Sequence, residues 1–337
     1  MKRFALIILQ LALSCMLLVS CQWAFDKRHA GARAVDIKVH RYDRLLDEYL
    51  GLNSFSALQK LNAEYAQETK FLIEDVLTIG SVTDENINLR LREYFLDSTL
   101  IKLRHDALEK FEDMEQIEKQ FTRGFRFLKR EMPGLEIPRV YAQLSALNQS
   151  VIVGDSVLGF SIDKYMGEDY YLYKNFYYDY QRRSMVPERI VPDCFRFYLL
   201  SEYPFPWEWH RTLLDHIVHR GKILWVVHQM LDYDTFEKTL GFTEREGEWC
   251  HERRDSVWNF LIETGHLHST DPMLVRIYLN AAPCTYTLGE NAPAEVGNWL
   301  GIHIVDEYMK KNKEVTVAEL FRDTDYREVL KKAGIPY

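Results

Sequence analysis

Apolar residues recur at helical spacing along most of the chain. The clearest stripe steps by three and four residues, has charged residues on the opposite face, and comprises Met114, Ile117, Phe121, Phe125, Leu128 and Met132. Pro133 and Gly134 follow it directly and predict the end of this helix. Similar spacing predicts helices over residues 187–203, 209–231, 254–264 and 294–310. A capping box from Thr316 to Glu319 predicts the start of the last helix.

Two stretches alternate between apolar and polar residues, as strands do. Val35–His40 places three apolar side chains on one side and predicts a first strand. Residues 151–153 and 157–162 flank Gly154-Asp155-Ser156, which predicts a β-hairpin with a glycine-containing turn. The expected fold class is therefore α+β, mainly α-helical, with a small sheet and flanking helices.

The first 21 residues have the pattern of a secretion signal. A basic start and an apolar run over residues 4–19 lead to Leu18-Val19-Ser20-Cys21, and the run is too short for a comfortable transmembrane helix. This ending resembles the bacterial lipobox, which implies cleavage before Cys21 and acylation of its thiol and amino group. Several acyl chains, at about 0.8 kcal/mol per buried CH2, make a stable membrane anchor. The alternative is ordinary cleavage that leaves a free thiol.

The composition is that of a globular protein with a sizeable core, since the 337 residues are 47% hydrophobic and 13% aromatic. We expect a lipoprotein signal peptide over residues 1–20, a lipid anchor and tether over 21–34, and a single globular domain over 35–337. The net charge of −8 and the lack of a basic stripe argue against nucleic acid as a partner. Beyond residues 1–21, which include Cys15 and Cys21, three cysteines remain. Their number is odd and they form no CxxC pair, so we expect buried free thiols at Cys194, Cys250 and Cys284.

Histidines are concentrated in the C-terminal part and raise the possibility of a metal site. Helical spacing places Asp215 and His219 on one face, with His216 beside them, as a pair of zinc ligands would lie. Residues 251–255 (His-Glu-Arg-Arg-Asp) imitate the HExxH pattern, but their two arginines would bring cations to a cation. We interpret these histidines as surface and capping residues and expect no cofactor.

Aromatic rings are dense over Tyr165–Tyr180. Tyrosine offers rigid contact area with a polar tip, so Tyr170, Tyr171 and Tyr173 are candidates for contact with a partner or a glycan. The alternative, which we favour, is a buried edge of the core beside the hairpin. The chain contains no G-x-S-x-G elbow, no P-loop and no G-x-G-x-x-G motif.

Six stretches together resemble the gliding-motility lipoprotein GldB family of Bacteroidota. They occur in the order of that family and are Val35–Asp43, Ile137–Gly167, Tyr180–Asp193, Leu213–Lys222, Trp249–Trp258 and Gly297–Met309. That family is in turn similar to predicted zinc peptidases in which a helix with HExxH precedes an LLDxxxxEG segment. The resemblance implies a helical part over 35–135 and a zincin-like core over 136–337, in which the hairpin around 151–162 forms the edge of a small sheet.

The departures from the peptidase pattern imply a degenerate site. The helix that would carry both histidines begins Val191-Pro192-Asp193-Cys194-Phe195-Arg196, and Arg220 stands before Gly221 where the third ligand would be glutamate. A guanidinium repels a metal ion. A groove beside an edge strand can still bind an extended peptide by strand addition, with Val151 and Val153 as contacts.

We therefore expect a non-enzymatic envelope lipoprotein that acts as a binding or assembly component of an envelope machine. Its partners would be a membrane, through the N-terminal lipid, and other envelope proteins. One alternative is a lipid-anchored metal-dependent hydrolase that uses Asp215, His216 and His219, and another is a binder of glycan or cell wall through residues 165–180. Residues 22–27 lack an acidic run of the kind that directs lipoproteins to the cell surface, which favours an anchor on the outer membrane facing the periplasm.

Overall fold

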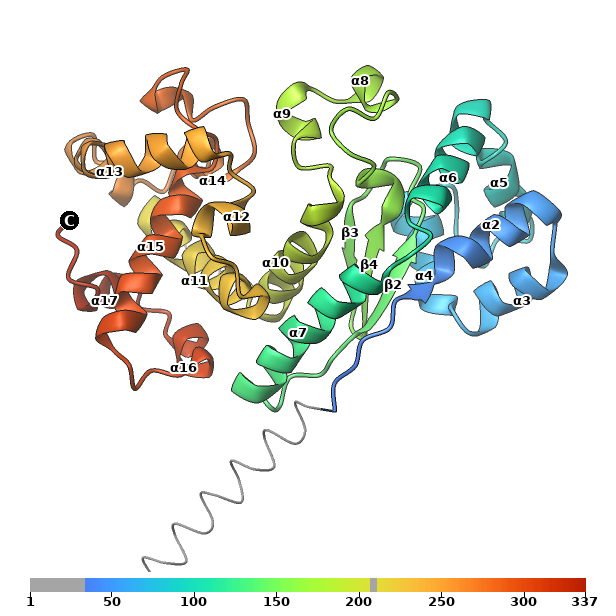
Figure 1. Cartoon of the computed structure of the whole chain (residues 1–337), viewed down its shortest axis with the longest axis horizontal. Helices are drawn as coiled ribbons and strands as arrows, with labels where there is room; N and C mark the ends of the chain where they lie inside the picture. The colour runs from blue at the N-terminus through green and yellow to red at the C-terminus, as the bar shows by residue number, and fades with distance from the viewer. Residues whose placement is uncertain (1–33, 207–210) are drawn as a thin grey trace, which may run out of the picture.

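The computed structural model describes residues 34–206 and 211–337 (Figure 1). The predicted signal peptide and Cys21 lie outside these residues, as does the start of the helix expected from residue 209. Within the described ranges, no helix has both the length and the apolar character needed to cross a bilayer.

Helices dominate the N-terminal part, as the apolar spacing predicts. They are α2 (Tyr42–Leu52), α3 (Phe55–Ala63), α4 (Ala66–Lys70), α5 (Ile87–Tyr94), α6 (Ser98–Lys110) and α7 (Glu115–Glu131), with a π-helical turn after α4 over Phe71–Val76. The predicted end of α7 before Pro133 is confirmed. The N–H of Met132 bonds back to the Leu128 carbonyl 2.7 Å away and completes the last turn.

A four-stranded sheet lies in the middle of the molecule. Its strands are β1 (His40–Arg41), β2 (Arg139–Gln143), β3 (Val151–Val153) and β4 (Val157–Ser161), in the order β1-β2-β4-β3. β2 runs parallel to β1 and β4, whereas β3 and β4 are antiparallel. The predicted hairpin is therefore confirmed, and β3 forms an edge of the sheet. Its turn is closed by the Gly154 N–H, which donates to the Val157 carbonyl at 2.9 Å.

The predicted strand over residues 35–40 is wrong except at its last residue. The N–H of Ile37 donates to Thr122 Oγ1 at 2.9 Å, and the N–H of Val39 donates to Glu118 Oε1 at 3.0 Å. Side chains of α7 thus accept the hydrogen bonds that these backbone N–H groups would otherwise donate to a neighbouring strand. The alternation still reports burial, because Ile37 and Val39 both lie in the core.

The C-terminal part is also helical. Its helices are α8 (Tyr173–Phe176), α9 (Asp179–Arg182), α10 (Ile190–Glu202), α11 (Leu213–Leu231), α12 (Phe236–Leu240), α13 (Glu244–Glu263), α14 (Pro272–Leu279), α15 (Val296–Lys311), α16 (Val317–Arg322) and α17 (Tyr326–Lys332). α13 begins ten residues earlier than predicted, because Thr243 and Glu246 form a capping box. The predicted box at Thr316 is confirmed, but it opens α16, and α17 follows.

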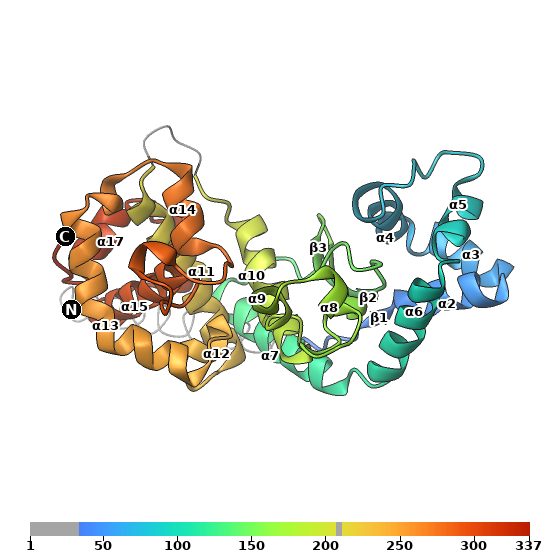
Figure 2. The ribbon, with the colours of Figure 1, turned by 90° about the horizontal axis from the view of Figure 1, so that it is seen from above.

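The sheet separates two groups of helices, and Figures 1 and 2 show α2–α6 on one side and α11–α17 on the other. α7 and α10 pack together between them. Phe125 of α7 meets Phe195 of α10 with ring centroids 5.0 Å apart, and Gly124 leaves the space that the Phe195 ring fills. These observations confirm the α+β, mainly helical class, whereas the zincin-like core stays a prediction.

Candidate functional site

A groove of about 520 Å³ lies beside the edge strand β3. Its walls come from the residues that enter β3, from α10 and α11, and from the segments that follow α12 and α14. The charged residues that line it are Arg183, Arg189, Asp193, Arg196, Arg220, Glu246 and Glu295. Most of these residues are partly or wholly withdrawn from solvent, so their charges act more strongly on one another than exposed charges do.

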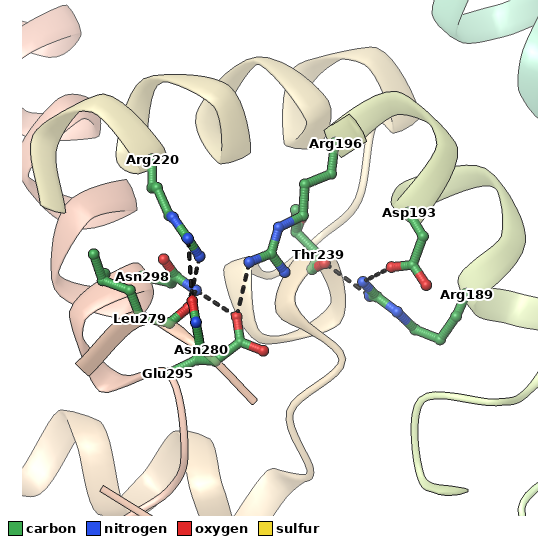
Figure 3. A network of polar contacts seen from close by, with 9 residues as sticks. All are labelled: Arg189, Asp193, Arg196, Arg220, Thr239, Leu279, Asn280, Glu295 and Asn298. Atoms are coloured by element: carbon green, nitrogen blue, oxygen red, sulfur yellow. Dashed lines mark hydrogen bonds and ion pairs between the residues drawn. The ribbon is translucent and has the colours of Figure 1, made fainter. Parts of the chain in front are cut away.

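Arg189, the residue before α10, and Asp193 in its first turn present one ion pair to the groove. Arg189 donates from Nη2 to Asp193 Oδ1 at 2.6 Å and from Nη1 to the Thr239 carbonyl at 2.8 Å (Figure 3). The two side chains are only 9% and 18% exposed. Burial lowers the pKa of Arg189, but the neighbouring Asp193 outweighs it and the pKa is raised. Tyr165 donates to the other Asp193 oxygen at 3.3 Å, so both oxygens of this carboxylate accept a hydrogen bond.

A second ion pair joins α10 to the start of α15. Arg196 donates from Nη2 to Glu295 Oε2 at 3.0 Å, and both side chains are largely buried. Glu295 is the residue before α15, where the positive end of the helix dipole favours a carboxylate. The Asn298 side chain, one turn into α15, donates to the same Glu295 oxygen. The acceptor is thereby held toward α10.

Arg220 of α11 differs from Arg189 and Arg196 in its hydrogen-bond acceptors, because those two arginines are each paired with a carboxylate. It donates to the Leu279 carbonyl at 2.7 Å and to Asn280 Oδ1 at 3.1 Å, which are neutral acceptors. Among the described residues, no carboxylate oxygen lies within ion-pair distance of it. Burial and the charge of Arg196 lower the pKa of Arg220 to about 10, so it stays charged at neutral pH. Figure 3 shows Arg220 and Arg196 reaching from adjacent helices toward the same space.

The arrangement is suited to binding negative charge. Arg196 and Arg220 share a single nearby carboxylate, that of Glu295, which leaves one positive charge uncompensated. Guanidinium groups bind carboxylates through paired hydrogen bonds. Cys194 gives no nucleophile here, because burial raises the pKa of its thiol far above the ordinary value.

The groove unites the two segments that the peptidase-like pattern singled out. Asp193 and Arg196 lie where the histidine-bearing helix was expected, and Arg220 stands at the position of the third ligand. Val151 also lines the groove, whereas Val153 is partly buried and packs against the core. Sequence reasoning missed Arg189, Glu295 and the asparagines. Arg189 and Asn298 lie in two of the stretches that resemble the GldB family, 180–193 and 297–309, and this was the signal in the sequence that could have identified them.

The tyrosine-rich segment is divided between core and surface. Tyr173 is fully buried and donates to the Asp163 carbonyl at 2.6 Å, so it supports the fold. Tyr170 is partly buried and donates to Asp106 at 2.9 Å. Tyr171 is 46% exposed and Tyr178 is 73% exposed, and these two are open to a ligand.

The histidine candidates of α11 each have a local partner. Asp215 accepts the N–H of Thr212 at 2.7 Å and so caps the helix. His216 stacks on Phe205 at 3.9 Å between ring centroids, and His219 Nδ1 lies 3.0 Å from the Tyr326 hydroxyl. In the part of the chain that the structure describes, the side chains close enough together to hold a metal ion are instead Glu237, His251 and His303. His251 thus does not share such a group with Asp255, the residue that stands where the HExxH pattern has its second histidine.

The profile of the family described as "Gliding motility protein GldB" matches residues 25–335. The chain belongs to the GldB family. The match confirms the predicted family, and it covers both walls of the groove. No curated protein and no solved structure matched the chain. The family is designated a lipoprotein family, in keeping with an envelope location, whereas the likeness to zinc peptidases stays a prediction.

Proposed function

We propose that this GldB family member is a non-enzymatic envelope lipoprotein whose groove binds an extended, acidic segment of a partner protein. The observation that carries the proposal is Arg220, a largely buried cation that faces Arg196 and is held by neutral acceptors. Acylated Cys21 would hold the folded body at the outer membrane, facing the periplasm. Binding at the groove would make the chain an assembly component of an envelope machine.

The edge strand supplies the means to hold a peptide backbone. β3 pairs with β4 on one side only, and residues 148–151 form one wall of the groove. An extended peptide that adds to such an edge gains main-chain hydrogen bonds, while alternate side chains enter neighbouring pockets. In the structure the Val151 carbonyl accepts a hydrogen bond from the Gln149 side chain at 3.1 Å. A backbone N–H of the bound peptide would replace Gln149 as the donor.

The arginines supply the specificity for an acidic segment. Burial and the charge of Arg196 lower the pKa of Arg220, and a bound carboxylate would relieve the repulsion between the two guanidinium groups. Each hydrogen bond to a charged group contributes about 1.5–3 kcal/mol. An acidic side chain or a C-terminal carboxylate would serve equally, whereas the corresponding amide would lose this contribution.

Site-specific photocrosslinking in cells tests the proposal. Phe197 lines the groove and is 49% exposed, so a photoreactive residue can replace it, and Leu52 on α2, 79% exposed, provides the control position. We expect a discrete crosslinked partner from position 197 that is lost on Arg220→Gln and kept on Arg90→Gln, a change of an exposed arginine elsewhere.

The segment identified in this way is then synthesised with its acidic group intact and as the amide. Binding of the acidic peptide to the purified, acylated protein should be at least tenfold tighter than binding of the amide. A crosslink that survives Arg220→Gln, or equal binding of the two peptides, would contradict the proposal.

Glycan binding is a second candidate, favoured by the exposure of neighbouring rings. Phe176 is 60% exposed, and Tyr178 stacks on Tyr180 with centroids 5.9 Å apart. Flat rings of this kind pack against sugar faces. Replacing Tyr171 and Tyr178 by leucine should then abolish retention on purified peptidoglycan while the groove crosslink persists. Retention that is unchanged by these replacements would eliminate this candidate.

A further inference from the structure

Three helices bring two imidazoles and a carboxylate together outside the groove. Glu237 of α12, His251 of α13 and His303 of α15 each offer one ligand atom, and these atoms all lie within 4.8 Å of one another. His251 Nε2 is 3.1 Å from Glu237 Oε1, and the rings of His251 and His303 have centroids 5.6 Å apart. None of the three residues is among those that line the groove.

The spacing fits a small tetrahedral ion. Zinc binds imidazole nitrogen and carboxylate oxygen at about 2.0–2.2 Å, which places neighbouring ligand atoms roughly 3.3 Å apart. The His251–Glu237 distance already meets this requirement, and the His303 ligand atom lies within 4.8 Å of the other two. Two histidines and a glutamate leave a fourth position for water.

His303 carries an unsatisfied buried nitrogen. Its Nε2 is shielded from solvent and has no hydrogen-bond partner among the described residues, which is costly for a polar atom. Burial, with Arg254 nearby, lowers the pKa of His303 to about 4, although Glu237 and Asp306 act in the opposite direction. The imidazole is therefore neutral at physiological pH and has a lone pair to offer.

The carboxylate is already oriented and ionised. Trp299 donates from Nε1 to Glu237 Oε1 at 2.8 Å, which fixes one oxygen. Burial favours protonation of Glu237, but this hydrogen bond and the nearby histidines outweigh it, and the pKa of Glu237 is lowered. Carboxylates that bind metal ions in proteins are usually held in place by hydrogen bonds of this kind. His251, with 57% of its side chain exposed, gives an ion access from solvent.

We propose that Glu237, His251 and His303 form a binding site for one divalent ion of the zinc class, with water completing the coordination. The ion would tie α12, α13 and α15 together. This inference is independent of the proposed groove function, because the two sites share no residue.

Metal titration of the tag-free, full-length acylated protein in detergent tests the site. After chelator treatment and its removal, Zn²⁺ alone is added, and bound zinc is counted by elemental analysis after gel filtration. We expect one tightly held equivalent and a rise in thermal unfolding temperature. Co²⁺ in the same site should show the strong visible absorption of a tetrahedral complex.

Variants separate this site from adventitious binding by other histidines. His251→Gln, at an exposed position that tolerates change, should weaken zinc affinity at least tenfold and remove both the stabilisation and the cobalt spectrum. Glu237→Gln and His303→Gln should do the same, and His268→Gln should match the wild type. Failure of the wild type to retain zinc, or retention unchanged in His251→Gln, would overturn the proposal.

Discussion

Gly221 of α11 and Gly301 of α15 lie backbone to backbone where their helices cross. A Cβ on Gly221 would overlap the Gly301 carbonyl, and a Cβ on Gly301 would overlap the Ile217 carbonyl. Only glycine permits so close an approach. Arg220 of the groove adjoins one glycine, and His303 of the proposed metal site lies two residues beyond the other. The crossing therefore lies next to one residue of each site.

Gly221→Ala should destabilise the protein, because the added methyl group meets backbone that cannot rotate away. Overpacking of this kind costs about 1–3 kcal/mol. Urea unfolding followed by circular dichroism measures the change. Gly134→Ala is the control, since nothing lies within 4 Å of a Cβ there, and it should leave the free energy of unfolding within about 0.5 kcal/mol. Equal stability of the two variants would disprove the close crossing.

Asp193→Asn should be strongly destabilising, because it leaves the Arg189 guanidinium buried without its counter-ion. Removal of one partner of a buried pair costs about 3–5 kcal/mol. The exposed Arg253–Glu252 pair provides the comparison, with side chains 46% and 69% exposed. Glu252→Gln should change the free energy of unfolding by less than about 1 kcal/mol. A similar, small loss in both variants would show that the Asp193 pair is solvated.

Stability should fall as the pH drops from about 6.5 to about 4. Burial, aided by Lys222, His216 and Arg220, lowers the pKa of His219 from 6.5 to about 4. Between these values the unfolded chain binds a proton that the folded protein does not, so acid favours unfolding. His219→Gln should reduce the slope of unfolding free energy against pH by up to one proton in this window. The measurement is made with a chelator present, and an unchanged slope would refute the assignment.

Thiol titration should report both burial and lipidation. Cys194 and Cys250 are buried, and burial raises the pKa of Cys250 to about 12, whereas Cys284 is partly exposed. In the folded full-length protein, an aromatic disulfide reagent should modify one thiol quickly, and Cys284→Ser should remove that phase. After cleavage before Cys21, which removes Cys15, and denaturation, we expect three reactive thiols if Cys21 carries a thioether, and a fourth would show an unacylated Cys21.

Local patterns in the sequence were sufficient for many of the elements. The α7 stripe, the β3–β4 hairpin and the Thr316 capping box depend on contacts between residues close together in the chain, so their spacing identifies them. The strand predicted over residues 35–39 was wrong, because alternation shows which side chains are buried but not which groups accept the hydrogen bonds of the backbone. Those groups, Glu118 and Thr122, are about 80 residues away.

The sequence by itself determined the helical and strand periodicity, the lipobox-like ending at Cys21, and a set of stretches specific enough to identify the family. It also marked Arg220 as a departure from a ligand pattern. Only the tertiary structure placed Arg196 opposite Arg220 and brought Glu237, His251 and His303 together. The reason is physical: charges and ligands act through distances in space, and the helix crossing at Gly221 and Gly301 joins segments that no local pattern connects.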